Sequence, residues 1–355
     1  MNVRKFAAVL LAALMVAALA ACGGSPAPSS STPAPAPAES PAAPAEPSSG
    51  SSAAPSASGE PIRIGVIQLM EHDALDAAYQ GFVDGLAEAG YKDGEQIKID
   101  FQNAQGEQAN CQTIADKFVS DKCDLVLAIA TPAAQAMANA TKDIPILVTA
   151  VTDPADAKLV ATNEAPGGNV TGTSDMNPVE EQMKLLKQLI PDAKTVGMLY
   201  NSSEANSKLQ VDMAKKVADT LGLTCVDYTV SNANEIQQVV ESAIGKVDAF
   251  YCPTDNVIAN GMVTVTGVTE PAKIPTICGE EGMVNNGGTA TFGLSYYNLG
   301  KLTATQAVDI LTGKSKPAEM PILYLSDCVL AINEESCAKM GLEIPQALKD
   351  QLAAG

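Results

Sequence analysis

The stretch DLVLAIATPAAQ, residues 124–135, decides the fold of this chain. Its first half is a continuous apolar run that begins after an Asp, which is typical of a buried parallel strand. The run stops at Thr131, and Pro132 follows where the first residue of a helix needs no amide partner, so we expect Thr131 to cap a new helix. The stretch therefore predicts a strand, a tight turn and a helix whose free amide groups point outward.

A second stretch of the same design, DAFYCPTDN, lies at residues 248–256. Its apolar run stops at Thr254, and Asp255 follows at the comparable edge. One copy thus offers amide donors and the other offers a carboxylate. We expect the two edges to face each other across a cleft and to bind a small zwitterion, with the amides after Thr131 on its carboxylate and Asp255 on its ammonium group. Helix capping is the alternative role for both residues.

Strand patterns and helix patterns alternate on either side of these two stretches. The alternation runs from residue 61 to residue 151 and restarts at residue 195. Strands that alternate with helices of about ten to fifteen residues predict a parallel sheet with right-handed crossovers. The sequence therefore predicts an α/β protein of two doubly wound parallel-sheet lobes, joined by a hinge. A central cleft is expected beyond the carboxyl ends of the strands.

The lobes are expected to be discontinuous, because the last strand patterns follow the second series and need partners in both sheets. The N-terminal lobe is predicted at residues 60–178 plus about 294–320. The C-terminal lobe is predicted at residues 179–293 plus about 321–355. The chain of 355 residues is long enough for two such cores.

The first 59 residues differ in composition from the rest of the chain. A basic start and an apolar run shorter than the roughly 20 residues of a membrane span predict a signal peptide over residues 1–22. LAAC at its end resembles the lipobox of bacterial lipoproteins, in which Cys22 carries the lipid; an ordinary signal peptide is the alternative. Residues 23–59, almost wholly Ser, Pro, Ala and Gly, predict a disordered tether. These features predict a lipid-anchored protein on the extracytoplasmic face of the cell membrane.

Charge and cysteine content exclude two classes of function. The formal net charge of −19 argues against nucleic-acid binding, which needs clustered Lys and Arg. Seven of the eight cysteines lie beyond the lipobox and form no CxxC pair, and His72 is the only histidine, so no metal site is expected. Disulfide pairing among these cysteines stays open.

Several segments, in order, resemble the substrate-binding component of an ABC importer, in the family linked to tryptophan and tyrosine. They are VIQLMEHDALDAAYQGF, NAQGEQAN, DLVLAIATPAAQAMANAT, ILVTAVTDP, PGGNVTGTSD, MLYNSSEANS, VDAFYCPTDN, GEEGMV and GLSYYNLG. The resemblance spans residues 61 to about 312. It implies a receptor without enzymatic activity or cofactor, whose lobes close on an amino acid and deliver it to permease and ATPase subunits. A sugar, nucleoside or branched-chain amino acid is the alternative ligand.

Polar residues that follow the predicted strands are further candidates for ligand contacts, and turn formation or capping explains each of them equally well. Glu71 and Glu280 are alternatives for the ammonium group, and Asn256 could assist at either end of the ligand. The additional candidates are Gln68, Glu71, Thr152, Asp153, Asn201, Ser203, Asn256 and Glu280.

An aromatic ligand would need an apolar or stacking wall, yet the chain has no Trp and only 4% aromatic residues. This scarcity is the internal argument against such a ligand. The candidates for the wall are Met70, Tyr200, Tyr251 and Tyr296. A surface enzyme is a remote alternative, because the chain has neither a GxSxG nor an HExxH motif.

Overall fold

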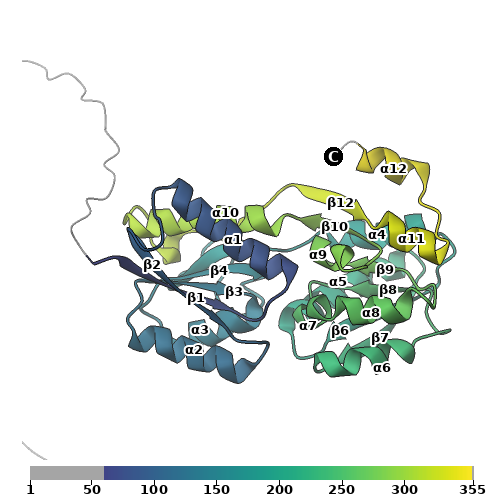
Figure 1. Cartoon of the computed structure of the whole chain (residues 1–355), viewed down its shortest axis with the longest axis horizontal. Coiled ribbons are helices and arrows are strands. Elements are labelled where there is room, and N and C mark those ends of the chain that lie inside the picture. Colours follow the sequence, from purple (N-terminus) through teal and green to yellow (C-terminus); the bar gives the residue numbers. More distant parts are fainter. Residues whose placement is uncertain (1–59, 354–355) are drawn as a thin grey trace, which may run out of the picture. The chain divides into compact units, whose positions relative to one another are not determined.

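The computed structural model describes residues 60–353 (Figure 1). The predicted signal peptide, Cys22 and the predicted tether lie outside this range. None of the helices in the described range is long and apolar enough to cross a membrane. The seven cysteines in this range are all free thiols, most of them buried.

The first sheet has six parallel strands in the order β11-β5-β4-β3-β1-β2. Its strands are β1 (Ile62–Gln68), β2 (Ile97–Asn103), β3 (Leu125–Ile129), β4 (Ile146–Val151), β5 (Val170–Ser174) and β11 (Leu323–Tyr324). Four helices cover it, with α1 and α10 on one face and α2 and α3 on the other (Figure 1). They are α1 (Asp73–Glu88), α2 (Gln108–Ser120), α3 (Thr131–Ala140) and α10 (Tyr296–Leu311). Every residue of β3, β4 and β5 is buried, as expected of strands covered on both faces.

The second sheet has the order β12-β10-β9-β8-β6-β7 and is parallel except for its edge strand β12. Its strands are β6 (Thr195–Asn201), β7 (Thr224–Val230), β8 (Ala249–Cys252), β9 (Thr276–Cys278), β10 (Ala290–Leu294) and β12 (Cys328–Ile332). Its helices are α4 (Val179–Leu189), α5 (Ala205–Thr220), α6 (Ile236–Glu241), α7 (Asn256–Asn260), α8 (Met262–Thr269), α9 (Glu281–Asn285), α11 (Glu334–Met340) and α12 (Gln346–Leu352). Short 3-10 helices lie at η1 (Ala233–Glu235) and η2 (Pro317–Glu319).

The first five strands of each lobe have the same order, so the second lobe repeats the topology of the first. The predicted fold class of two doubly wound α/β lobes is confirmed, with one antiparallel strand at the edge of the second sheet. Parallel strands in this order place all their carboxyl ends on one side of the sheet, which is where such folds bind ligands.

The chain passes between the two lobes three times. The crossings lie between β5 and α4, between β10 and α10, and between β11 and β12. The sequence placed the last crossing near residue 320, but β11 at Leu323–Tyr324 still pairs with β5 in the first sheet. The segment PILYLSD, residues 321–327, reads as a strand in the sequence, but its pattern does not show which of the two sheets it joins.

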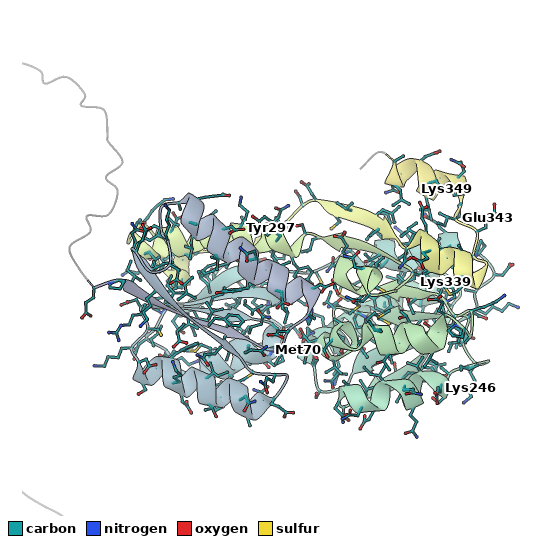
Figure 2. The ribbon with its side chains drawn as sticks, viewed as in Figure 1. Met70, Lys246, Tyr297, Lys339, Glu343 and Lys349 are labelled. Carbon is teal, nitrogen blue, oxygen red and sulfur yellow. The ribbon has the colours of Figure 1, made fainter. Side chains whose placement is uncertain are left out.

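Helices α1 and α10 pack so closely that glycine is required on both. A Cβ atom on Gly81 would overlap the carbonyl oxygen of Tyr297, and one on Gly300 would overlap the carbonyl oxygen of Ala78. The hydroxyl group of Tyr297, a residue labelled in Figure 2, donates a hydrogen bond of 2.9 Å to Asp84 on α1. This contact fixes α10, which follows the second crossing, onto the first lobe.

We expect Gly300→Ala to lower the free energy of unfolding by about 1–3 kcal/mol, because its methyl group forces the two helices apart. Gly267→Ala in α8 is the matched control, since nothing lies within 4 Å of its Cβ position. That control should be neutral or should stabilise the protein by roughly 0.5–1 kcal/mol. Chemical unfolding followed by circular dichroism measures both, and equal effects would contradict the close packing.

Candidate functional site

The carboxyl ends of the two sheets meet, and polar side chains bridge them. His72, after β1, lies 3.3 Å from Asn256 of α7, measured from ring Nε2 to amide Oδ1. Thr152, after β4, lies 3.4 Å from Thr254, after β8, between their hydroxyl oxygens. The amide of Gln210 also donates to Thr152 over 3.0 Å. The edge at Thr254 thus faces the ends of β1 and β4, whereas the edge at Thr131, which was expected to face it, lines a different cavity with Asn201 and Ser203.

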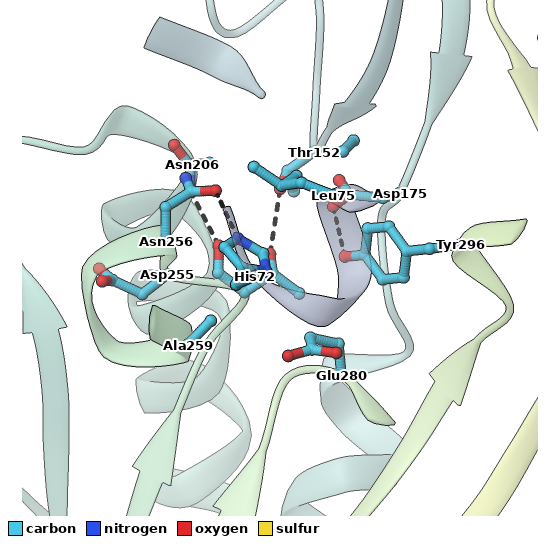
Figure 3. Close-up of a pocket in the computed structure, with 12 residues that line it drawn as sticks. His72, Leu75, Thr152, Asp175, Asn206, Asp255, Asn256, Ala259, Glu280 and Tyr296 are labelled. Atoms are coloured by element: carbon cyan, nitrogen blue, oxygen red, sulfur yellow. Dashed lines mark hydrogen bonds between the residues drawn. The ribbon is translucent and has the colours of Figure 1, made fainter. Parts of the chain in front are cut away.

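A small cavity lies between these strand ends (Figure 3). Its volume is about 10 Å³, which is room for about one water molecule. An amino acid therefore reaches it only if the lobes separate first. Residues from both lobes line the cavity: His72, Leu75, Ala150, Thr152, Asp175, Asn206, Thr254, Asp255, Asn256, Ala259, Glu280 and Tyr296.

Three buried polar atoms of the lining residues have no hydrogen-bond partner. They are Oδ1 of Asp175, Oδ1 of Asn206 and Nδ1 of His72. Buried polar atoms are nearly always paired in folded proteins, and an unpaired one costs about 1–3 kcal/mol. Three such atoms around one cavity make it the candidate site for the polar groups of a ligand.

Asp175 is a site residue that the sequence interpretation missed. It follows β5 directly, and its Oδ2 accepts a hydrogen bond of 2.6 Å from the hydroxyl of Tyr296, the first residue of α10. Burial raises the pKa of this carboxyl. The other candidates were chosen because they follow a strand, and Asp175 follows a strand as well. The segment VTGTSD therefore contained enough information to select it. Asn206 and Glu204 were also missed, because they lie at the start of α5 and not directly after a strand.

Asp255 lines the cavity, but its oxygens already accept three hydrogen bonds from the protein. Oδ1 accepts from the amide of Ile258 and so caps α7, while Oδ2 accepts from the amide of Asn201 and the hydroxyl of Ser207. Capping was the alternative that the sequence left open for this residue. Asn256 donates its side-chain amide to Glu204 over 2.6 Å, which connects it to a second buried carboxyl.

Two glutamates at the site have strongly perturbed pKa values. Burial, followed by repulsion from Asp255, raises the pKa of Glu204 to about 8. Burial raises the pKa of Glu280 to about 7, against the hydrogen bonds it accepts from the amides at the start of α9. Burial lowers the pKa of His72 to about 4, so this imidazole is neutral at neutral pH. The residues that line the cavity therefore carry no positive charge.

The prediction for Thr131 is wrong in its local geometry. Helix α3 begins at Thr131 itself, the capping position is Ala130, and no side chain caps the helix. Ala130 has a φ angle of 80°, a left-handed conformation that turns the chain sharply enough to start the helix one residue early. Ala150, in a β-bulge of β4, has a φ of 54° and lines the cavity. Such strained backbone costs roughly 1–3 kcal/mol per residue and is common at binding sites.

The predicted site residues divide into three groups. Thr152, Asp255, Asn256 and Glu280 line the small cavity. Thr131, Asn201 and Ser203 line a second cavity of about 270 Å³. The other three lie in neither cavity.

Those three have local roles or are exposed to solvent. Gln68 is buried and donates to Met70 O and Asp76. Asp153 accepts two hydrogen bonds from amides of its own turn and one from the side chain of Asn163. Glu71 is exposed, and only its carbonyl oxygen reaches the other lobe, where Asn260 donates to it.

Comparison with known proteins places this geometry in context. The family model described as ABC transporter substrate binding protein matches residues 63–353. A curated relative, the tyrosine-binding protein of Clostridioides difficile strain R20291, is 46% identical over 280 residues, which cover 79% of this chain and 81% of the relative.

Two solved structures differ in how well they superpose. An ABC domain from Streptococcus pneumonia in complex with L-Trp is 43% identical, covers 82% of this chain and 98% of its own, and has a TM-score of 0.80. A ligand-free, open substrate-binding protein from Clostridium difficile is 48% identical, covers 80% and 96%, and has a TM-score of only 0.63. The present structure is thus more similar to the ligand complex than to the open form, despite the lower identity.

Replacing Glu204 by Gln is expected to reduce the loss of stability at alkaline pH. The folded-state pKa of about 8 exceeds the ordinary value of 4.5, so the folded state retains a proton that the unfolded state releases, and stability is lost as pH rises through about 8. Gln mimics the protonated form and does not titrate. Thermal unfolding between about pH 5 and about pH 9 should show a smaller fall in midpoint for Glu204→Gln than for wild type.

The matched control is Glu164→Gln, the same substitution at an exposed side chain. Its midpoint should fall with pH as the wild type does. A Glu204→Gln profile that coincides with this control would contradict a buried, protonated Glu204.

Proposed function

Because the chain belongs to the family of ABC transporter substrate-binding proteins, we propose that it captures a free amino acid between its lobes and delivers it to membrane permease and ATPase subunits. The single observation that supports this proposal most strongly is the cavity between the strand ends. Three buried polar atoms of its lining residues have no hydrogen-bond partner within the protein. Capture and release need no chemical step, so we propose a receptor without enzymatic activity.

The proposed ligand is L-tyrosine or L-tryptophan. One similar protein carries the name tyrosine-binding protein, and another was solved in complex with L-Trp. Leu75, Ala150 and Ala259 give the cavity apolar walls, and Tyr296 supplies an aromatic ring. Of the other tyrosines considered for the wall, Tyr251 is fully buried and donates to Gln182, which is a core role.

Closure of the lobes follows from contacts that exist only when the two rims meet. The bridges His72 to Asn256 and Thr152 to Thr254 are neutral and long, and each such hydrogen bond contributes only about 0.5–1.5 kcal/mol. A ligand that contacts both rims would add to these bonds and shift the population toward the closed form. Opening the lobes to release the ligand to a permease then breaks only weak hydrogen bonds between the rims.

Binding of an amino acid is tested on the purified full chain by thermal shift and calorimetry. L-tyrosine or L-tryptophan at about 100 times its Kd should stabilise the protein by about 2.7 kcal/mol, which raises the midpoint by several degrees. Branched-chain amino acids, common sugars and nucleosides complete the panel. A shift with sugars or nucleosides alone would overturn the proposed ligand.

Anchoring through Cys22 is proposed from the lipobox and the composition after it, both outside the described residues. Cys22→Ala in the expressing cell should release the protein from the membrane fraction into soluble extracytoplasmic material, since the lipid-bearing thiol is lost. Fractionation followed by immunoblotting measures this, with Cys328→Ala, an exposed cysteine of the folded part, as control. Membrane retention of both variants would contradict the anchor.

A further inference from the structure

We propose that Asp175 binds the ammonium group of the ligand and that Tyr296 is the positioning residue that orients the Asp175 carboxylate. This inference rests on the proposed function and deepens it, because it assigns the group that selects ligands with a primary ammonium. The sequence alone favoured Asp255 for this task.

Asp175 is held in place by hydrogen bonds to its side chain and to its backbone. Its Oδ2 accepts the hydroxyl hydrogen of Tyr296 over 2.6 Å, and its backbone carbonyl accepts from the side chain of Asn177 over 3.0 Å. Asn177 in turn accepts from the amide of Leu294 over 3.2 Å. Figure 3 shows Asp175 and Tyr296 side by side at the cavity, joined by their hydrogen bond. The residue is 4% exposed, and its Oδ1 accepts no hydrogen bond within normal geometry. The hydroxyl of Thr152 lies close enough to lower the pKa of the carboxyl, but that hydroxyl already accepts from Gln210.

The other buried carboxyls at the site are already satisfied by the protein. Asp255 accepts three hydrogen bonds, Glu280 accepts two backbone amides, and Glu204 accepts from Asn206 and Asn256. Asp255 and Glu280 accept through both oxygens. Glu204 accepts only through Oε2, but its pKa is raised to about 8 and it does not line the cavity. Asp175 is the buried carboxyl of the lining with an oxygen that lacks a donor, so it is the one with capacity for a ligand.

The unmatched charge of Asp175 calls for a cation from outside the protein. No Lys or Arg is among the residues that line the cavity, and His72 is neutral. A buried carboxylate is stable only when it is paired and hydrogen-bonded. A primary ammonium supplies both the charge and up to three N–H donors, of which Oδ1 of Asp175 and Oδ1 of Asn206, also unpaired, can each take one.

The first test compares ligands on the wild-type full chain by calorimetry. L-tyrosine is paired with 3-(4-hydroxyphenyl)propionate, and L-tryptophan with 3-(indol-3-yl)propionate, so that each pair differs only in the ammonium group. We expect the acid that lacks the ammonium to bind about 10- to 100-fold more weakly than its amino acid, as for the loss of a charged hydrogen bond. Equal affinities within a pair would overturn the assignment without any substitution.

The second test uses variants. Asp175→Asn should weaken amino acid binding about 10- to 100-fold, whereas Asp156→Asn, an exposed Asp of the same lobe, should change it less than about twofold. Circular dichroism verifies folding. If Asp175→Asn does not fold, the pH dependence of Tyr296→Phe, which keeps the carboxyl and removes its donor, decides. Equal affinities of the two variants would overturn the role of Asp175 alone, while a wild type that binds neither amino acid would overturn the proposed function as well.

The positioning role of Tyr296 is read from the pH dependence of affinity. Tyr296→Phe removes a donor that holds the pKa of Asp175 down, so the loss of affinity on acidification should begin at a higher pH than in wild type. Asp175→Asn should not show the part of this loss of affinity that comes from protonation of Asp175. The other titratable groups that face this cavity, His72, Asp255 and Glu280, are the same in all variants. A parallel shift in affinity with an unchanged pH profile would overturn the positioning role.

Discussion

Burial of three carboxyl groups around one small cavity, without a Lys or Arg among the lining residues, is the constraint on which this site depends. Asp255 and Glu280 meet it by capping short helices, where backbone amides and the helix dipole offset their desolvation. Asp175 meets it only in part, through Tyr296. Two of the three carboxyl groups therefore have both oxygens hydrogen-bonded within the protein, and Asp175 has only one.

The repeated topology explains why these groups converge. Parallel strands in the same order end on the same side of each sheet, so the residues after β4, β5, β8 and β9 reach one place from two lobes. The bridges between the rims are neutral hydrogen bonds, apart from the bond that Asn286 donates to Asp73. Neutral bonds are weak enough to break without a large barrier, which fits a receptor that must open again.

Periodicity was sufficient to predict the fold, because buried parallel strands and amphipathic helices leave patterns that a single sequence displays. The site was harder to predict from the sequence. Four residues chosen for their position after a strand, Thr152, Asp255, Asn256 and Glu280, line the small cavity. Position could not tell a satisfied carboxylate from an unsatisfied one, because that depends on tertiary partners such as Tyr296. Thr131 failed for a local reason, since the left-handed conformation of Ala130 has no signature in an alanine.

The three crossings between lobes also determine when each lobe can finish folding. The first lobe lacks α10 and β11 until residue 324 has been synthesised, and without α10 the apolar surface of α1 and of one sheet face has no cover. Neither half can therefore complete its core while the remainder is still being made. A chain built this way reaches its final compaction only after nearly all of it has been synthesised, so its two lobes mature together and not one after the other.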